Sequence, residues 1–192
     1  MRQILVYADS LTWGIIPNTR LRFPFDERWP GVLENRLNDA GHRVRLIEIN
    51  SPLSLVILML GTNDFQFSHP HNNAWSAAQG VATLVNEIRR APIEPGMPVP
   101  PVLVVCPPPI RAPRGPAAEK FAGADERSAG LADAYRAACA ALACHFFDSS
   151  TVASSSHVDG VHLDRDQHLV LGQALAGFIA PMLGPDLQNR EA

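Results

Sequence analysis

Residues 55–64 read LVILMLGTND, an apolar run that ends in a glycine and three polar residues. A short, continuous apolar run rich in branched side chains is typical of a β-strand that is buried on both faces. Other segments of the chain have the same character. The predicted strands are Ile4–Ala8, Val44–Ile49, Leu55–Leu60, Val102–Cys106 and His145–Phe147.

Amphipathic stretches that are typical of helices lie between or after most of these strands. They are Arg28–Ala40, Trp75–Arg90, Ala129–Leu142 and Asp166–Met182. Strands that alternate with helices predict βαβ units, and therefore a mainly parallel five-stranded sheet with helices on both faces. We expect a three-layer α/β/α, flavodoxin-like domain over residues 1–184, followed by a polar tail over 185–192.

The composition excludes several classes of protein. The chain has 192 residues, of which 46% are hydrophobic and 18% charged, and a net charge of −3. No apolar run approaches the ~20 residues of a membrane span, and the N-terminus lacks the features of a signal peptide. The acidic balance argues against nucleic acid as a partner. We therefore expect a cytoplasmic protein with no membrane or nucleic-acid partner. The three cysteines form no CxxC pair, so they predict neither a disulfide framework nor a zinc site.

The connection between the second and third predicted strands is unusually short. Only residues 50–54 separate Ile49 from Leu55, whereas parallel strands of one sheet need a crossover of a dozen or more residues. Five residues reach roughly 17–21 Å when fully extended, about the length of the strand that the chain must travel back along. Either these strands are antiparallel, or residues of the natural protein are absent between Asn50 and Ser51. We favour the second interpretation.

Polar side chains follow two of the predicted strands and precede the last helix. Ser10 comes directly after the first strand, Asn63 follows the third, and Asp159 and His162 lie in the last loop. The carboxyl ends of parallel strands share one edge of a sheet, so these side chains are expected to converge there. They supply what a serine hydrolase needs, namely a nucleophile, an amide donor for the oxyanion, and a base with its orienting carboxylate.

At these positions the sequence resembles the SGNH hydrolases, or GDSL-type esterases, and in particular their arylesterase-like group. The family's first block GDSLTWG appears as residues 8–14, ADSLTWG, its GTND block as residues 61–64, and its DGxH block as residues 159–162. The resemblance runs from Ile4 to Leu183. It implies a cofactor-free esterase in which Ser10 is the nucleophile, His162 the base and Asp159 its partner.

Two departures from the family pattern affect the predicted site. Ala8 replaces the glycine of the first block, which strains the turn only if its φ is positive. The family's second block, whose glycine N–H joins the oxyanion hole, is missing at the short junction described above. The resemblance thus implies Ser10 N–H and the Asn63 amide as oxyanion donors, with Asn50 as a candidate for the third. We expect Asp9 and Asp64 to be structural and to accept hydrogen bonds from backbone N–H groups of their own loops.

Apolar side chains near the same edge suggest a pocket for a small ester. The predicted lining residues are Trp13, Ile15, Phe65, Pro108 and Ile110. Such a pocket favours short-chain aryl or alkyl esters, and the resemblance adds acetylated sugars and acyl transfer to alcohols or peroxide. It also leaves the formation of a homo-oligomer open. His69 and His71 have no neighbouring Cys or acidic cluster, so we predict no metal site. His157 is the nearest rival to His162, but it precedes Asp159.

Two other classes of protein remain as alternatives. The missing second block and Ala8 favour a catalytically impaired SGNH-fold protein with a binding or scaffold role. A flavodoxin-like signalling or flavin-binding domain shares the layer architecture. However, the single lysine, Lys120, does not directly follow the fourth strand, and no phosphate-binding glycine loop is present. The sequence therefore favours the serine esterase.

Overall fold

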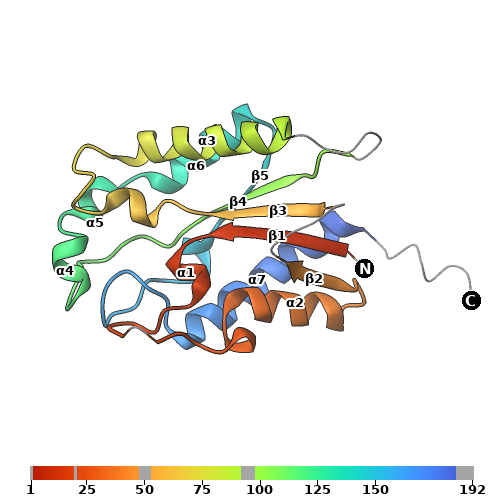
Figure 1. Ribbon diagram of the computed structural model, residues 1–192, viewed down its shortest axis with the longest axis horizontal. Coiled ribbons are helices and arrows are strands. Elements are labelled where there is room, and N and C mark those ends of the chain that lie inside the picture. The colour runs from red at the N-terminus through yellow and green to blue at the C-terminus, as the bar shows by residue number, and fades with distance from the viewer. Residues whose placement is uncertain (1, 20, 48–52, 92–97, 185–192) are drawn as a thin grey trace, which may run out of the picture.

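The computed structural model describes residues 2–19, 21–47, 53–91 and 98–184. Its centre is a five-stranded sheet of order β2-β1-β3-β4-β5 in which every neighbouring pair is parallel (Figure 1). The strands are β1 (Arg2–Ala8), β2 (Val44–Ile47), β3 (Leu53–Met59), β4 (Val102–Cys106) and β5 (His145–Asp148). The predicted parallel five-stranded sheet is confirmed.

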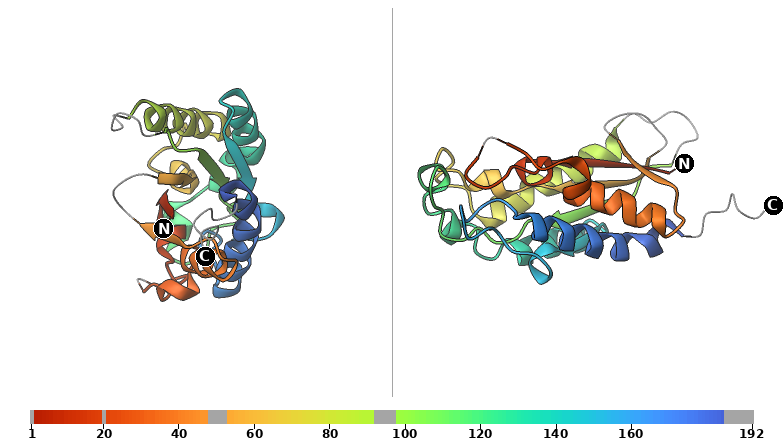
Figure 2. Two further views of the ribbon diagram at one scale, coloured as in Figure 1. Left: turned by 90° about the vertical axis from the view of Figure 1, so that its right-hand side faces the viewer. Right: turned by 90° about the horizontal axis from the view of Figure 1, so that it is seen from below.

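Helices cover the sheet on both faces and complete three layers (Figure 2). The long helices are α2 (Trp29–Asp39), α3 (Ala74–Arg90), α6 (Leu131–Ala141) and α7 (Arg165–Leu183), and the one-turn helices are α1 (Ser10–Trp13), α4 (Ala117–Lys120) and α5 (Ala124–Arg127). Helices α2 and α7 pack on one face of the sheet, and α3 and α6 pack on the other. Each predicted helix is present within two residues of its expected bounds.

The contact between α2 and α7 fixes the start of α2, which lies near the predicted site. Gly172 of α7 lies against α2, where an added Cβ would be 2.6 Å from Val32 Cβ. One turn earlier, Trp29 N–H donates to Nδ1 of the buried His168. Burial lowers the pKa of His168 to about 4, so the ring is neutral and accepts this bond at neutral pH.

The registers of β2 and β3 bear on the two interpretations of the short connection between them. Both strands are parallel to β1, so the antiparallel alternative is wrong. Ile47 lies level with Leu5, and Leu53 lies level with Gln3, only two residues back along β1. Two residues along the strand and two strand spacings across it give a separation of about 12 Å, which five linking residues can span. The Asn50–Ser51 junction lies outside the described residues, but reach alone no longer requires missing chain there.

One face of the sheet is only partly covered over β1. Leu5 packs against the α3–α6 layer, whereas Tyr7, two residues further along the same face, is 57% exposed. A central strand of a doubly wound sheet is normally covered on both faces. The α3–α6 layer therefore does not extend over the carboxyl end of β1.

Among the described residues, no helix has the length and apolar character that crossing a bilayer requires.

Candidate active site

The predicted nucleophile stands at the start of a one-turn helix. Ser10 is the first residue of α1, directly after β1, and Asp9 caps the helix by accepting a hydrogen bond from Leu11 N–H at 3.0 Å. The first N–H groups of a helix have no partner within it, so the Ser10 N–H is available to an anion. Asp9 thus bonds the backbone of its own loop, as we predicted.

The alanine that replaces the family's glycine is accommodated. Ala8 is the last residue of β1, and it is absent from the non-glycine residues with positive φ, which are Asn18, Arg43 and Ala143. Its methyl group therefore causes no backbone strain before Ser10.

The predicted oxyanion amide lies on a tight turn after β3. Gly61 has a φ of 122°, and the 3-10 helix η2 (Thr62–Phe65) follows it. A Cβ on Gly61 would lie 2.4 Å from the hydroxyl oxygen of Tyr135, a buried side chain that donates a hydrogen bond to Leu60 O at 3.1 Å. Only glycine satisfies both the backbone conformation and the close approach of Tyr135.

Two side chains hold the Asn63 amide from opposite ends. Gln66 Nε2 donates to Asn63 Oδ1 at 2.6 Å, and Asn63 Nδ2 donates to Asp9 Oδ2 at 3.4 Å. The amide nitrogen carries two hydrogens, so one N–H remains free. Gln66 was not identified from the sequence, because its contact with Asn63 depends on the geometry of the 3-10 turn between them.

Asp159 and His162 form a hydrogen-bonded pair in the loop before α7. His162 Nδ1 lies 2.7 Å from Asp159 Oδ2, and Asp159 Oδ1 accepts the backbone N–H groups of Val161 and His162. Asp159 is 2% exposed. Burial raises its pKa, but the hydrogen bond from His162 and the two N–H donors outweigh that effect and lower the pKa below its usual value. The carboxylate therefore stays charged beside the imidazole at neutral pH.

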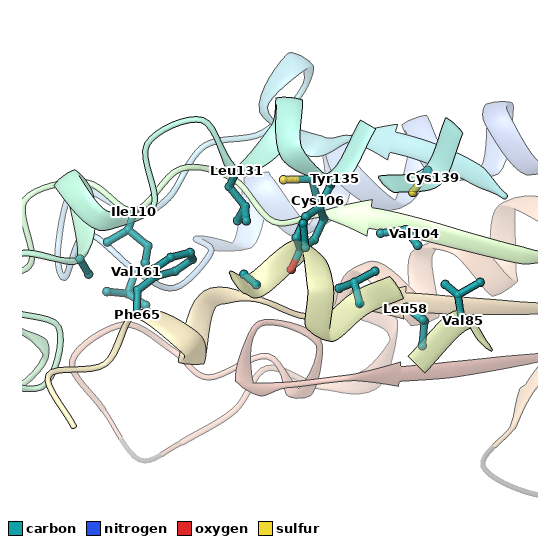
Figure 3. Close-up of a cluster of buried hydrophobic side chains, with 14 of the residues drawn as sticks. Leu58, Phe65, Val85, Val104, Cys106, Ile110, Leu131, Tyr135, Cys139 and Val161 are labelled. Atoms are coloured by element: carbon teal, nitrogen blue, oxygen red, sulfur yellow. The ribbon is translucent and has the colours of Figure 1, made fainter. Parts of the chain in front are cut away.

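A small apolar cluster holds the loops of Asn63 and His162 together. Val161, directly before His162, is buried with Phe65 of η2 and with Ile110 of the loop after β4 (Figure 3). The backbone adds a further tie, since Arg111 N–H donates to Gly160 O at 2.8 Å. The cluster positions His162 relative to the Asn63 turn.

The structure brings the predicted site residues to the carboxyl edge of the sheet but does not join all of them. Burial raises the pKa of Asp9, the residue before Ser10, to about 6, and the Leu11 N–H and His162 oppose that rise. Among the described residues, Ser10 Oγ makes no hydrogen bond to His162. Such contacts are often long in ligand-free enzymes and tighten when substrate binds.

The predicted pocket is divided between two cavities, each of about 440 Å³. Phe65, Pro108 and Ile110 line one, together with Thr62 beside Asn63. Trp13 lines the other, together with Asp9 and Thr12, which flank Ser10. Ile15 lines neither cavity, since its backbone pairs with Arg22 in an isolated antiparallel bridge. One cavity is thus lined by sequence neighbours of Ser10, and the other by a sequence neighbour of Asn63.

The remaining predictions for this region concern Asp64, His157, a metal site and Asn50. The side chain of Asp64 accepts no backbone hydrogen bond from a described residue, so that part of the prediction is wrong, and burial raises its pKa. His157 is exposed and makes no contact with Asp159. Within the described ranges no group of three or more His, Cys, Asp or Glu is placed to hold a metal ion. Asn50, the candidate third donor, lies outside them.

Comparison with known proteins assigns the chain to a family. The model of the GDSL-like lipase/acylhydrolase family matches residues 9–171, which include the Ser10 turn, the Asn63 turn and the Asp159–His162 loop. The chain belongs to this family. Membership makes it a carboxylic ester hydrolase by class, as the sequence predicted.

Solved structures of this hydrolase's relatives agree with that assignment. Est24, a carbohydrate acetylesterase from Sinorhizobium meliloti, is 30% identical with a TM-score of 0.86, and the match covers 95% of this chain and 100% of that one. An aryl esterase from M. smegmatis is 31% identical with a TM-score of 0.85 and the same coverage. A search of curated proteins finds no match.

Proposed function

We propose that this hydrolase cleaves short-chain acyl esters through a triad of Ser10, His162 and Asp159. The observation that carries the proposal is the 2.7 Å hydrogen bond between His162 Nδ1 and the buried, charged Asp159. That bond places the proton of the neutral ring on Nδ1, so that Nε2 is free to act as a base.

The reaction proceeds in two stages. Ser10 Oγ attacks the ester carbonyl while His162 Nε2 takes its proton, and collapse of the tetrahedral adduct releases the alcohol, which receives that proton. Water then attacks the acyl-enzyme by the same route and releases the acid. Asp159 stabilises the imidazolium that forms in each stage.

The oxyanion is held by two donors from the described residues, the Ser10 N–H and the free N–H of the Asn63 amide. Gln66 acts as a positioning residue, because its donation to Asn63 Oδ1 fixes which end of the amide faces the reacting carbonyl. Removing one oxyanion donor costs on the order of 10²–10³ in rate. The enzyme is therefore slowed, rather than inactive, if a third donor is absent.

The substrate class follows from the two cavities and from the structural neighbours. The cavities flank the Ser10 and Asn63 turns and suit the acyl and alcohol parts of a small ester. The neighbours are described as carbohydrate acetylesterases and aryl esterases, so acetylated sugars and aryl acetates are the first substrates to test. An alcohol that enters in place of water would give acyl transfer.

Kinetics with 4-nitrophenyl acetate test the triad. Ser10→Ala and His162→Ala should each lower kcat by on the order of 10⁴ or more, and Asp159→Asn should also lower it strongly. His157→Ala is the matched control and should retain the wild-type rate, since His157 has no contact with Asp159. Equal rates for Ser10→Ala and the wild type would rule out this nucleophile and favour a binding role for the fold.

A further inference from the structure

The cavity beside the nucleophile has an unusual charge. It is lined by Asp9, Thr12 and Trp13 around the Ser10 turn, and by Val6, Ala8, Phe25, Arg28, Pro30, Arg45 and Leu46. Both oxygens of Asp9 are engaged elsewhere, with Leu11 N–H and with Asn63 Nδ2, neither of which lines the cavity. Asp9 keeps its negative charge in these bonds at neutral pH, so one carboxylate and two guanidinium groups line the cavity, and their sum is positive.

Arg28 is held in place without a carboxylate partner. It is only 8% exposed, and its stem packs so closely on α1 that a Cβ on Gly14 would lie 2.3 Å from Arg28 Cδ. Arg28 Nη1 donates to Trp13 O at 3.3 Å, and the guanidinium lies 5.2 Å from the centre of the Phe25 ring. The remaining edge of the guanidinium, formed by Nε and Nη2, makes no hydrogen bond to a described residue, and Nε is buried without a partner.

The surroundings add positive charge and do not neutralise it. Glu27, the neighbouring acidic residue, pairs with Arg165. Burial and the nearby Arg22 lower the pKa of Arg28, and no described carboxylate forms a salt bridge with it. An arginine is nonetheless always protonated in proteins. A buried cation without a counter-charge is costly, and an anionic ligand removes that cost.

We propose that this cavity binds the carboxylate of an anionic ester, which the guanidinium of Arg28 holds while Ser10 attacks the ester carbonyl. A guanidinium forms charge-assisted hydrogen bonds to carboxylate oxygens. Arg45, exposed at the cavity, draws the anion in. The inference names a substrate class and rests on the proposed function.

The first experiment compares matched charged and neutral esters on the unmodified enzyme. The pair 4-nitrophenyl hemisuccinate and 4-nitrophenyl methyl succinate places the carboxylate on the acyl side. The pair 4-acetoxybenzoate and methyl 4-acetoxybenzoate places it on the alcohol side. Charge-assisted hydrogen bonds predict that kcat/KM favours the charged member of one pair by about 10- to 100-fold. No preference in either pair would overturn the proposal.

Variants then assign the preference to Arg28. The charged-to-neutral ratio of kcat/KM cancels any general damage to the enzyme and any difference in intrinsic reactivity. Arg28→Gln should abolish the preference, and Arg28→Lys should keep only part of it, because an ammonium group keeps the charge without the planar geometry of the guanidinium. Arg36→Gln removes the same charge from an exposed position of α2 outside the cavity and should keep the wild-type ratio. An unchanged ratio in Arg28→Gln would refute the assignment.

A binding measurement separates this inference from the proposed function. Calorimetry on the Ser10→Ala protein compares the monomethyl succinate anion with methyl succinamate, its neutral amide. Tighter binding of the anion that is lost in the Ser10→Ala/Arg28→Gln double variant supports the carboxylate site even if no ester is hydrolysed. Equal binding of the two ligands, or tighter binding of inorganic phosphate than of the carboxylate, would overturn it even if neutral esters are hydrolysed.

Discussion

Changing Gln66 to glutamate tests whether the amide of Asn63 is held in a catalytic orientation. In the wild type, Gln66 Nε2 donates to Asn63 Oδ1 at 2.6 Å, which leaves Asn63 Nδ2 to serve Asp9 and the oxyanion. The charged carboxylate that Gln66→Glu introduces can only accept a hydrogen bond. The amide would then turn its Nδ2 toward position 66 and its Oδ1 toward the oxyanion. When that carboxyl group is protonated it donates, as glutamine does, and restores the wild-type orientation.

Two further variants, Gln66→Met and Asn63→Ala, set the expected size of the effect on kcat. A hydrogen bond contributes about 0.5–1.5 kcal/mol, so Gln66→Met, which removes the donor without adding charge, should lower kcat about 2- to 10-fold. Losing the oxyanion donor costs on the order of 10²–10³, which Asn63→Ala should show. Gln66→Glu should approach the Asn63→Ala rate at about pH 8 and recover roughly a sixth of the wild-type rate at about pH 5, where about one glutamate in six is protonated. KM should change little throughout.

The assay measures kcat for 4-nitrophenyl acetate from about pH 5 to about pH 8, a range that spans the titration of a histidine and the onset of protonation of a glutamate. Each Gln66→Glu value is divided by the wild-type value at the same pH. The division removes any pH dependence that both proteins share. A ratio that rises toward low pH supports the positioning role of Gln66. A ratio that is constant with pH, or a Gln66→Met enzyme as active as the wild type, would refute it.

Three further predictions concern stability. The pKa of Asp9 is raised to about 6 in the folded protein, from an ordinary value of 3.8, so its contribution to stability is present below pH 3.8 and lost as the pH rises through 6. Urea unfolding at about pH 4.5 and about pH 7.5 measures this loss. Between these two pH values the free energy of unfolding should fall by about 2 kcal/mol less in Asp9→Asn than in the wild type. Equal decreases in the two proteins would count against the raised pKa. Gly61→Ala should lower the free energy of unfolding by more than about 1 kcal/mol, because Gly61 has a positive φ and faces Tyr135. Gly80→Ala, at an uncrowded position of α3, should raise it by about 0.5–1 kcal/mol. Equal Tm values for the two variants would contradict this prediction. Tyr135→Phe should cost about 0.5–1.5 kcal/mol by removing the hydrogen bond that the Tyr135 hydroxyl donates to Leu60 O, and an unchanged denaturation midpoint would show that the bond contributes nothing.

The sequence predicted the sheet because each strand can be recognised from its own residues. Continuous apolar runs identified all five strands, and the prolines after Cys106 end β4 where expected. The errors are in the bounds of helices and strands, at positions where the backbone conformation and not the residue type sets the boundary. Helix α6 begins at Leu131, not at Ala129, because Gly130 adopts a φ of 80° before it. Strand β3 extends back to Leu53 because the register shift at Ile4 accommodates Ser54.

The candidate site was predictable where residue type alone indicates chemistry. Ser10, Asn63, Asp159 and His162 each follow a strand or precede a helix, and the sheet brings their loops to one edge. Arg28 could not be found in this way, because its unpaired guanidinium results from packing against Gly14 at the end of a different helix. The single predicted pocket likewise became two, since side-chain packing and not chain order decides where space remains.

The central claim is that His162 activates Ser10, and a covalent probe tests it most directly. The wild type is treated with a fluorophosphonate, and mass spectrometry of the digested protein locates the adduct. The account predicts labelling on Ser10 that becomes far slower in His162→Ala and keeps its rate in His157→Ala. Labelling on another serine, or none on Ser10 in a folded protein, would contradict it.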